Sequence, residues 1–278
     1  MPTLSLLSLR NLTITVADFF SDEKILVDGL NLEIPSLKIV ALVGGSGSGK
    51  TTTGLSILRL LPVALRVARG EIVFQSNNIL EYPQEKMRGI RGKEIGMVFQ
   101  EPLNAFNPVF TVGYQIAEVL KAHTPLTAQH IPERVQHLLT IVGIKDSPRI
   151  SRSYPHQLSG GLRQRAMIAQ AIAGGPKLLI ADEPTSNLDV TSQAHIIELF
   201  RKLKEELRIS ILLITHDLGM VAHLADEVAV LSEGKVVERG ETREVLENPQ
   251  HPYTMELMKA MLVSWLVARD SYKEDKNL

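Results

Sequence analysis

Residues 38–53 read KIVALVGGSGSGKTTT, and this stretch decides the fold. Its first part, KIVALV, is a continuous apolar run that ends at glycine, which is typical of a strand buried on both faces. The chain from Thr51 to Pro62 has helical composition. A strand, a glycine-rich turn and a helix in this order predict an α/β fold with unpaired backbone N–H groups at the helix start. Such a turn is a common binding site for an anion, which we call an anion seat.

The turn, which we call the glycine loop (residues 44–52), fits the pattern G-x-x-x-x-G-K-[ST]. Glycines let backbone N–H groups approach phosphate oxygens closely, because side chains would block them. In this pattern Lys50 reaches the β- and γ-phosphates and the Thr51 hydroxyl ligates Mg²⁺. The loop is therefore predicted to bind a nucleoside triphosphate. The residues assigned to this role are Gly44, Gly45, Ser46, Gly47, Ser48, Gly49, Lys50, Thr51 and Thr52.

A second buried strand is predicted within LLIADEP (178–184), and it ends in two carboxylates. Ligands of open α/β sheets bind at the carboxyl ends of the strands, where Asp182 lies. Successive side chains of a strand point to opposite faces, so Asp182 and Glu183 have different tasks. We expect Asp182 to hold the metal and Glu183 to orient or deprotonate an attacking water. The alternative is a carboxylate pair at a helix N-terminus without a catalytic task.

Two more polar residues follow predicted strands. Gln100 ends GMVFQ and His216 ends ILLITH. Taken alone, each is an ordinary polar residue at a strand end. In a sheet that binds a triphosphate, the glutamine can sense metal and water and the histidine can hydrogen-bond the γ-phosphate.

LSGGLRQRA (158–166) places a serine and two glycines directly before a stretch of helical composition. The N-terminus of that helix offers free N–H groups and about half a positive charge, so it predicts a second anion seat.

Composition limits the class of protein. The 278 residues carry a formal net charge of −1, which argues against a nucleic-acid partner. The absence of cysteine excludes disulfides, thiolate zinc sites and cysteine-ligated iron–sulfur clusters. We find neither a signal peptide nor a run of about 18 apolar residues, so we expect a soluble protein that does not span a membrane by itself.

The order of the predicted elements indicates a parallel sheet with helices between its strands. The pattern turns helical and polar between about 101 and 174, which predicts an inserted helical subdomain. A helix is expected at about 190–207, and a hairpin over 227–240 that turns near Glu233 and Gly234. Further strands are expected at 4–16, 25–34, 71–74, 94–99, 177–182 and 210–215. We divide the chain into a nucleotide-binding domain (1–252) and a C-terminal helix with a polar tail (253–278).

The motifs together resemble the nucleotide-binding subunit of ATP-binding-cassette (ABC) transporters. The resemblance rests on the order of the glycine loop, Gln100, LSGGLRQRA, LLIADEP, the SNLD of 186–189 and the His of LLITHD, and it covers nearly the whole chain. It implies an α/β phosphate-loop NTPase fold with a mixed sheet core, an N-terminal antiparallel β subdomain and an inserted helical subdomain. It also implies ATP and Mg²⁺ as cofactors. The catalytic residues would be Glu183, His216 and Gln100, and the metal ligands Thr51, Gln100 and Asp182.

In this family two cassettes face each other head to tail. Ser159, Gly160 and Gly161 therefore resemble the residues that close over the γ-phosphate of ATP held by the other subunit. By the same resemblance, Ser186 and Asp189 lie at the dimer interface, and Gln100 couples the site to a permease through the helical subdomain.

Four longer segments are similar to ATPase subunits of dipeptide, oligopeptide and nickel importers, in particular to the first of their two cassettes. They are FQEPLNAFNP (99–108), YPHQLSGGLRQR (154–165), DEPTSNLDVTSQA (182–194) and NPQHPYTMELM (248–258). The resemblance implies a peptide importer, with nickel or metallophore import as the alternative. Its partners would be a second, different cassette, two permease subunits and a separate solute-binding protein, at the cytoplasmic face of the membrane. The single cassette disfavours a soluble cassette ATPase of DNA repair or translation, and the HPYT segment disfavours an export cassette.

Some positions depart from the family pattern. Leu162 stands where Gln or Met is common, and Val16 where an aromatic residue usually stacks on adenine. Three alternatives stay open: Phe19 or Phe20 replaces the aromatic residue, the adenine is held loosely, or both phenylalanines simply pack in the loop after the strand. The iron–sulfur element of many oligopeptide members is expected to be absent. The segment MELMKAMLVSWLVA (255–268) is apolar almost all round a helix, which predicts docking on its own domain, on the partner cassette or on the membrane surface.

Overall fold

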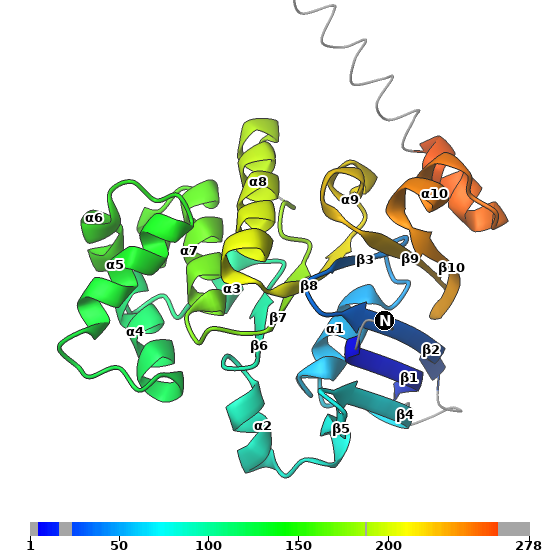
Figure 1. Ribbon diagram of the computed structural model, residues 1–278, viewed down its shortest axis with the longest axis horizontal. Helices are drawn as coiled ribbons and strands as arrows, with labels where there is room; N and C mark the ends of the chain where they lie inside the picture. Colours follow the sequence, from blue (N-terminus) through cyan, green and yellow to red (C-terminus); the bar gives the residue numbers. More distant parts are fainter. Residues whose placement is uncertain (1–4, 17–23, 187, 261–278) are drawn as a thin grey trace, which may run out of the picture.

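A six-stranded sheet forms the centre of the computed structural model, which describes residues 5–16, 24–186 and 188–260 (Figure 1). The strand order is β10-β9-β3-β8-β7-β6, and β10 alone among these is antiparallel to its neighbour. The strands are β3 (Ile39–Val43), β6 (Ile95–Val98), β7 (Leu178–Asp182), β8 (Ser210–Thr215), β9 (Glu227–Ser232) and β10 (Lys235–Glu241). The predicted hairpin is confirmed, since Glu233 and Gly234 form its turn with φ of +47° and +78°.

Both faces of this sheet are buried, which explains the unbroken apolar runs. Ile39, Ala41 and Val43 of β3 belong to a core shared with the helices, whereas Val40 and Leu42 belong to a second core on the opposite face. Since side chains alternate along a strand, a strand between two cores has to be apolar at every position.

A four-stranded antiparallel sheet closes the second core, with the order β2-β1-β4-β5. Its strands are β1 (Ser5–Val16), β2 (Lys24–Pro35), β4 (Leu65–Phe74) and β5 (Asn77–Asn78). The strand predicted at 71–74 is longer than expected, because β4 already pairs with β1 from Leu65. Gly70 interrupts its sequence pattern, and a Cβ at this position would lie 2.5 Å from the backbone oxygen of Asn11. Because glycine has no Cβ, Gly70 allows β1 and β4 to approach each other closely at this position.

The helix after the glycine loop is shorter than predicted. This helix, α1 (Lys50–Ile57), ends five residues before Pro62, since Arg59 adopts a left-handed conformation with φ of +52°. The N–H of Leu60 then donates to the carbonyl of Leu55 and closes the helix end.

The predicted helical block forms one lobe of the molecule (α4 to α7 in Figure 1). Its buried side chains continue directly into the core on the β3 face that carries Ile39 and Val43. The predicted helix at 190–207 is confirmed as α8. The helices are α2 (Gln84–Ile90), α3 (Pro102–Ala105), α4 (Val112–His123), α5 (Ile131–Ile141), α6 (Ser147–Arg152), α7 (Gly160–Ile172), α8 (Val190–Leu207), α9 (Leu218–Leu224) and α10 (Thr242–Glu247), with 3-10 turns η1 (Ile79–Glu81) and η2 (Pro155–Gln157).

Asp226 fixes the start of β9 against β3 and α8. Its carboxylate accepts hydrogen bonds from the Ile39 N–H (2.7 Å) and from Lys204 Nζ (2.8 Å), and Lys38 lies 3.4 Å away. Burial alone would raise the pKa of Asp226, but the Ile39 N–H and the two lysines outweigh it, and the pKa is lowered. The carboxylate is thus stabilised in its charged form.

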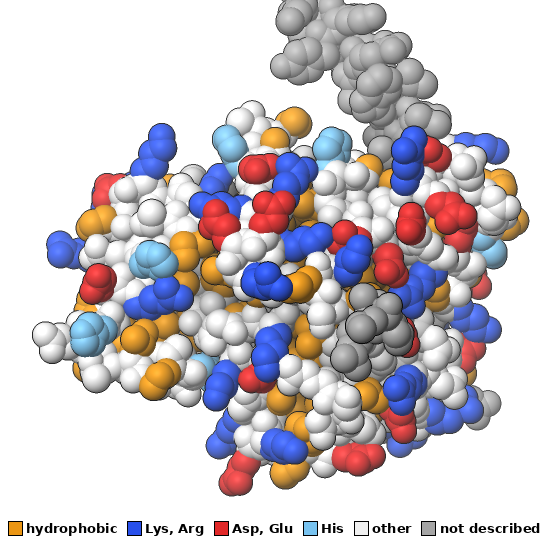
Figure 2. All heavy atoms as spheres, in the orientation of Figure 1, with side chains coloured by type: hydrophobic (Ala, Val, Ile, Leu, Met, Phe, Trp, Pro, Cys, Tyr) orange, Lys and Arg blue, Asp and Glu red, His pale blue; other side chains and the backbone are white. Residues whose placement is uncertain are grey.

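Residues 252–260 form a further helix beside α10, which we call the C-terminal helix (Figure 1). Tyr253, Leu257 and Met258 pack against the core that β3 shares with the helices, which we call the helix-side core. The described part of this segment therefore docks on its own chain. The rest of the apolar segment, from residue 261, lies outside the described residues, as do Phe19 and Phe20. No helix within the described ranges is long and apolar enough to cross a bilayer. On the face in Figure 2, acidic and basic side chains are interspersed.

Candidate nucleotide-binding site

The carboxyl ends of three adjacent parallel strands meet at one edge of the six-stranded sheet. β3 ends at Val43, paired with Thr215 of β8, and Asp182 of β7 is paired with Ile214. This register places the start of the glycine loop beside the residues that follow β7 and β8. Motifs more than a hundred residues apart in the sequence therefore converge.

The glycine loop wraps around the ammonium group of Lys50. Lys50 is buried, and its Nζ donates hydrogen bonds to the carbonyls of Gly44 (2.8 Å) and Gly45 (2.9 Å). Burial lowers the pKa of Lys50, although the charges of Glu183 and Asp182 oppose this shift. Gly49 precedes α1 with φ of +103°, a conformation that side chains disfavour. Three loop residues, Ser46, Gly47 and Thr51, are exposed, so an anion can reach the loop from solvent.

Asp182 lies against the first turn of α1. The Thr51 hydroxyl donates to Asp182 Oδ1 at 3.1 Å, and the aspartate is only 2% exposed. Burial raises the pKa of Asp182 to about 6; the nearby charge of Glu183 acts in the same direction, while Thr51 and Lys50 act against it. No salt bridge to Asp182 is found within residues 5–16, 24–186 and 188–260, and a cation would stabilise a carboxylate buried in this way.

Glu183 turns away from Asp182 because its backbone leaves the strand with φ of +46°. Its Oε1 lies 2.8 Å from His216 Nδ1, and its Oε2 accepts a hydrogen bond from the Thr215 hydroxyl at 3.2 Å. The two neighbouring carboxylates therefore have different partners, but through the left-handed backbone of Glu183 and not through alternation along a strand, since β7 ends at Asp182. Asp182 faces the glycine loop and Glu183 faces the end of β8.

Gln100 lies in a bend two residues after the end of β6. Its backbone carbonyl accepts a hydrogen bond from the Ser186 hydroxyl at 3.5 Å. Within the described ranges, no hydrogen bond joins the Gln100 side chain to Thr51 or Asp182. The structure thus brings together Lys50, Thr51 and Asp182, and separately Glu183 and His216, but not the amide of Gln100.

The predicted second anion seat starts α7. Ser159 caps this helix by accepting a hydrogen bond from the Leu162 N–H at 3.4 Å, and Asp189 caps α8 by accepting from the Ser192 N–H at 2.9 Å. The two helix starts are neighbours, since a Cβ at Gly161 would lie 3.3 Å from the Ser192 hydroxyl oxygen. A hollow of about 290 Å³ lies between these segments, lined in part by Gly160, Ser186 and Leu188. The residues assigned to the partner's nucleotide and to the dimer interface therefore share one surface.

Two residues near the site were not found by sequence reasoning. Thr215 holds Glu183 and also accepts a hydrogen bond from the Asp217 N–H at 3.0 Å. Tyr253 contacts the glycine loop, since its phenol oxygen accepts a hydrogen bond from the Gly45 N–H at 2.8 Å. Thr215 could have been identified from the sequence, because it ends a predicted strand next to His216. Nothing in the sequence indicates that Tyr253 contacts the glycine loop.

The carboxylate of Glu183 borders a hollow of about 360 Å³. This hollow lies between the end of β8 and the C-terminal helix, and its lining includes His216, Asp217, Leu257 and Ala260. One wall of the space next to Glu183 is therefore apolar and comes from the segment that begins with HPYT.

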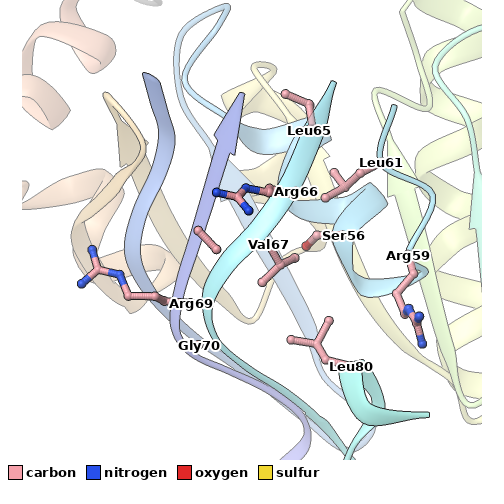
Figure 3. Close-up of a pocket in the computed structure, with 10 residues that line it drawn as sticks. Ser56, Arg59, Leu61, Leu65, Arg66, Val67, Arg69, Gly70 and Leu80 are labelled. Carbon is pink, nitrogen blue, oxygen red and sulfur yellow. The ribbon is translucent and has the colours of Figure 1, made fainter. Parts of the chain in front are cut away.

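A hollow of about 450 Å³ between α1 and β4 is lined by arginines but does not form an anion seat. In Figure 3, Arg66 and Arg69 extend from β4 on one side, and Arg59 lies on the other. The guanidinium of Arg59 also donates to the carbonyl of Tyr82. The three arginine side chains do not converge on one point.

The arrangement of two sheets and an inserted helical lobe is that of an ATP-binding cassette. A dimeric cassette in a post-hydrolysis state, MJ0796 bound to ADP and Pi, superposes with a TM-score of 0.76 and 27% identity, over 85% of this chain and 99% of that one. The profile of the ABC transporter family matches residues 27–186. The chain belongs to this family.

Two relatives are similar over almost the whole chain. The peptidoglycan transport ATP-binding protein YejF of Agrobacterium fabrum is 45% identical over 93% of this chain. The oligopeptide transport ATP-binding protein OppD of Bacillus subtilis is 43% identical over 92% of it. The chain spans 47% of the length of the first relative and 72% of the second.

Proposed function

We propose that this chain binds ATP at the glycine loop and hydrolyses it to power a membrane importer of peptides. The observation that carries the proposal is the convergence of Lys50, Thr51 and Asp182 at the sheet edge where Glu183 and His216 lie. The names of the relatives, which include an oligopeptide transport ATP-binding protein, support the kind of cargo.

Mg²⁺ fits the Thr51–Asp182 pair. Both side chains offer oxygen, which is the ligand type of Mg²⁺, and phosphates and water complete its shell in sites of this kind. Burial raises the pKa of Asp182 despite the nearby charge of Lys50, and a bound cation would oppose this shift further. When bound, the metal neutralises charge on the β- and γ-phosphates. Gln100 is proposed as a further metal ligand, and this requires its side chain to move toward Thr51.

Glu183 is proposed to orient the attacking water and to accept its proton. The water oxygen forms a bond to the γ-phosphorus while the bond between that phosphorus and the β,γ-bridging oxygen breaks. His216 holds Glu183 at 2.8 Å and has a mostly exposed ring, so it can hydrogen-bond a γ-phosphate beside the carboxylate. Lys50 is proposed to bind the β- and γ-phosphates after exchanging its loop carbonyl partners for them.

We further propose a head-to-tail dimer in which Ser159, Gly160 and Gly161 cover the nucleotide of the partner. The exposed start of α7 beside Ser186 and Asp189 supports this arrangement. The partner is proposed to be a second, different cassette, and the complex to include two permease subunits and a separate solute-binding protein at the cytoplasmic face of the membrane. We retain the division into a cassette (1–252) and a C-terminal segment (253–278) as part of this proposal.

The first test concerns nucleotide. The purified chain should bind ATP and release phosphate in the presence of Mg²⁺, and Lys50→Ala should abolish productive ATP binding, because the ammonium is the main cation at the loop. Lys177→Ala is the matched control, since Lys177 forms a surface ion pair with Glu94 far from the loop in the sequence. Unchanged affinity and turnover in Lys50→Ala would contradict the site.

The second test concerns transport. Purification from native membranes in mild detergent should recover this chain with two permease subunits and a second cassette, identified by mass spectrometry. A co-purifying solute-binding protein can then be titrated with peptides and with nickel. Recovery of the chain alone, or with ribosomes or DNA-repair factors, would contradict the importer while leaving the ATPase intact.

A further inference from the structure

The first peptide group of the glycine loop is held from both ends. The carbonyl of Gly44 accepts a hydrogen bond from Lys50 Nζ at 2.8 Å, and the N–H of Gly45, in the same peptide plane, donates to the phenol oxygen of Tyr253 at 2.8 Å. An ammonium on the carbonyl polarises the peptide and strengthens its N–H as a donor, so the two hydrogen bonds reinforce each other.

The segment that carries Tyr253 is anchored on β10 through its backbone. The carboxylate of Glu238 accepts hydrogen bonds from the N–H groups of Gln250 (2.8 Å) and His251 (3.0 Å), just before the C-terminal helix. His251 Nδ1 then accepts from the Tyr253 N–H at 3.2 Å, and the next residue, Thr254, is completely buried. The helix start is therefore anchored, and the Tyr253 ring packs on the helix-side core.

The loop leaves little room at this contact. A Cβ added to Gly45 would lie 3.0 Å from the phenol oxygen of Tyr253, which is closer than most such contacts. Glycine at position 45 thus accommodates the phenol without a shift of the neighbouring backbone.

We propose that Tyr253 is a positioning residue for the nucleotide site, which holds the peptide plane between Gly44 and Gly45 and so presets the orientation of the glycine loop. The inference rests on the proposed binding of ATP at this loop. The phenol acts on the N–H of Gly45, at the entry to the segment whose later N–H groups are proposed to bind the phosphates. A loop that is already ordered loses less entropy when the nucleotide binds.

The test uses the full chain with Tyr253→Phe, which keeps the ring and removes the hydroxyl. The control is Tyr82→Phe, which removes a phenol hydroxyl at the end of η1. In nucleotide-free protein, hydrogen–deuterium exchange of a peptide that contains Gly45 should be faster in Tyr253→Phe than in wild type or the control.

Steady-state kinetics then separate positioning from a purely structural role. Loss of one hydrogen bond to the loop should raise the KM for ATP about threefold to tenfold, with kcat and the melting temperature nearly unchanged. A lower melting temperature with an unchanged KM would assign Tyr253 a structural role only and overturn the inference, as would unchanged exchange at Gly45. If wild type itself neither binds nor hydrolyses ATP, the proposed function fails, whereas a hydrolysing wild type matched by Tyr253→Phe refutes only the inference.

Discussion

Oε1 of Glu183 lies 2.8 Å from Nδ1 of His216, at the carboxyl ends of two neighbouring strands. The contact joins a carboxylate whose side chain is 10% exposed to an imidazole that is 70% exposed. One partner is thus fixed inside the protein and the other reaches into solvent. This arrangement suits a carboxylate that acts on a water molecule at the protein surface.

Glu183→Gln should retain ATP binding and reduce the rate of hydrolysis by about 10²-fold to 10⁴-fold, because an amide cannot accept the proton of the attacking water. Phosphate release and equilibrium binding of ATP measure the two effects separately. Glu198→Gln is the control, since Glu198 forms an exposed ion pair with Arg201. Hydrolysis at the wild-type rate in Glu183→Gln would exclude Glu183 as the base.

Ser159→Arg should leave the chain's own ATP binding intact and block hydrolysis at the site of the partner. Ser159 caps α7, and an arginine there would occupy the space in front of the helix start. In dimers with the unmodified partner cassette, Ser159→Arg in this chain should abolish hydrolysis at the partner's glycine loop, whereas Lys50→Ala in this chain should abolish it at this chain's own loop. An effect confined to the nucleotide of the mutated subunit would argue against a shared site.

Asp182→Asn should stabilise the nucleotide-free protein at neutral pH in the presence of a chelator. The folded-state pKa of Asp182 is raised to about 6, so its favourable contribution is complete below the unfolded pKa and is lost as the pH rises to about 6. The variant should therefore nearly match wild type near pH 4 and exceed it by about 3 kcal/mol at pH 7, as measured by urea unfolding. A difference that does not change with pH would refute this assignment.

Asp226→Asn should destabilise the fold by about 1–3 kcal/mol at pH 7, because the backbone N–H of Ile39 and the ammonium of Lys204 lose a charged partner. Since the pKa of Asp226 is lowered by folding, its contribution is present above the unfolded pKa and is lost as the pH falls below it. The difference in urea midpoint should shrink toward pH 3. Asp146→Asn, in an exposed pair with Arg149, should have little effect.

The sequence alone predicts the convergence of Lys50, Asp182 and His216, because each follows an apolar run and parallel strands end at one edge. It also predicts the turn at Glu233 and Gly234, because glycine adopts the positive φ that such a turn requires. These features depend on short sequence patterns, which can be recognised without knowledge of the tertiary structure.

Other features depend on tertiary packing. Helix α1 ends through a left-handed Arg59, a residue type with no preference for that conformation. The contact between Gly45 and Tyr253 spans 208 positions and depends on where β10 places the C-terminal helix. The HPYT segment indicates a subfamily by resemblance, but its spacing does not reveal which atom its tyrosine contacts. The rotation of the Gln100 side chain is likewise not determined by its position after β6.

The contact of Gly45 with Tyr253 also bears on protein engineering. The family profile ends at residue 186, so a shortened gene designed around it would omit both β10 and the phenol. A chain that is cut after residue 250 and fused there to a tag would lack Tyr253, so the N–H of Gly45 would lose its partner. Reporter groups are better attached within the exposed loop between α4 and α5, which lies in a different lobe from the C-terminal helix.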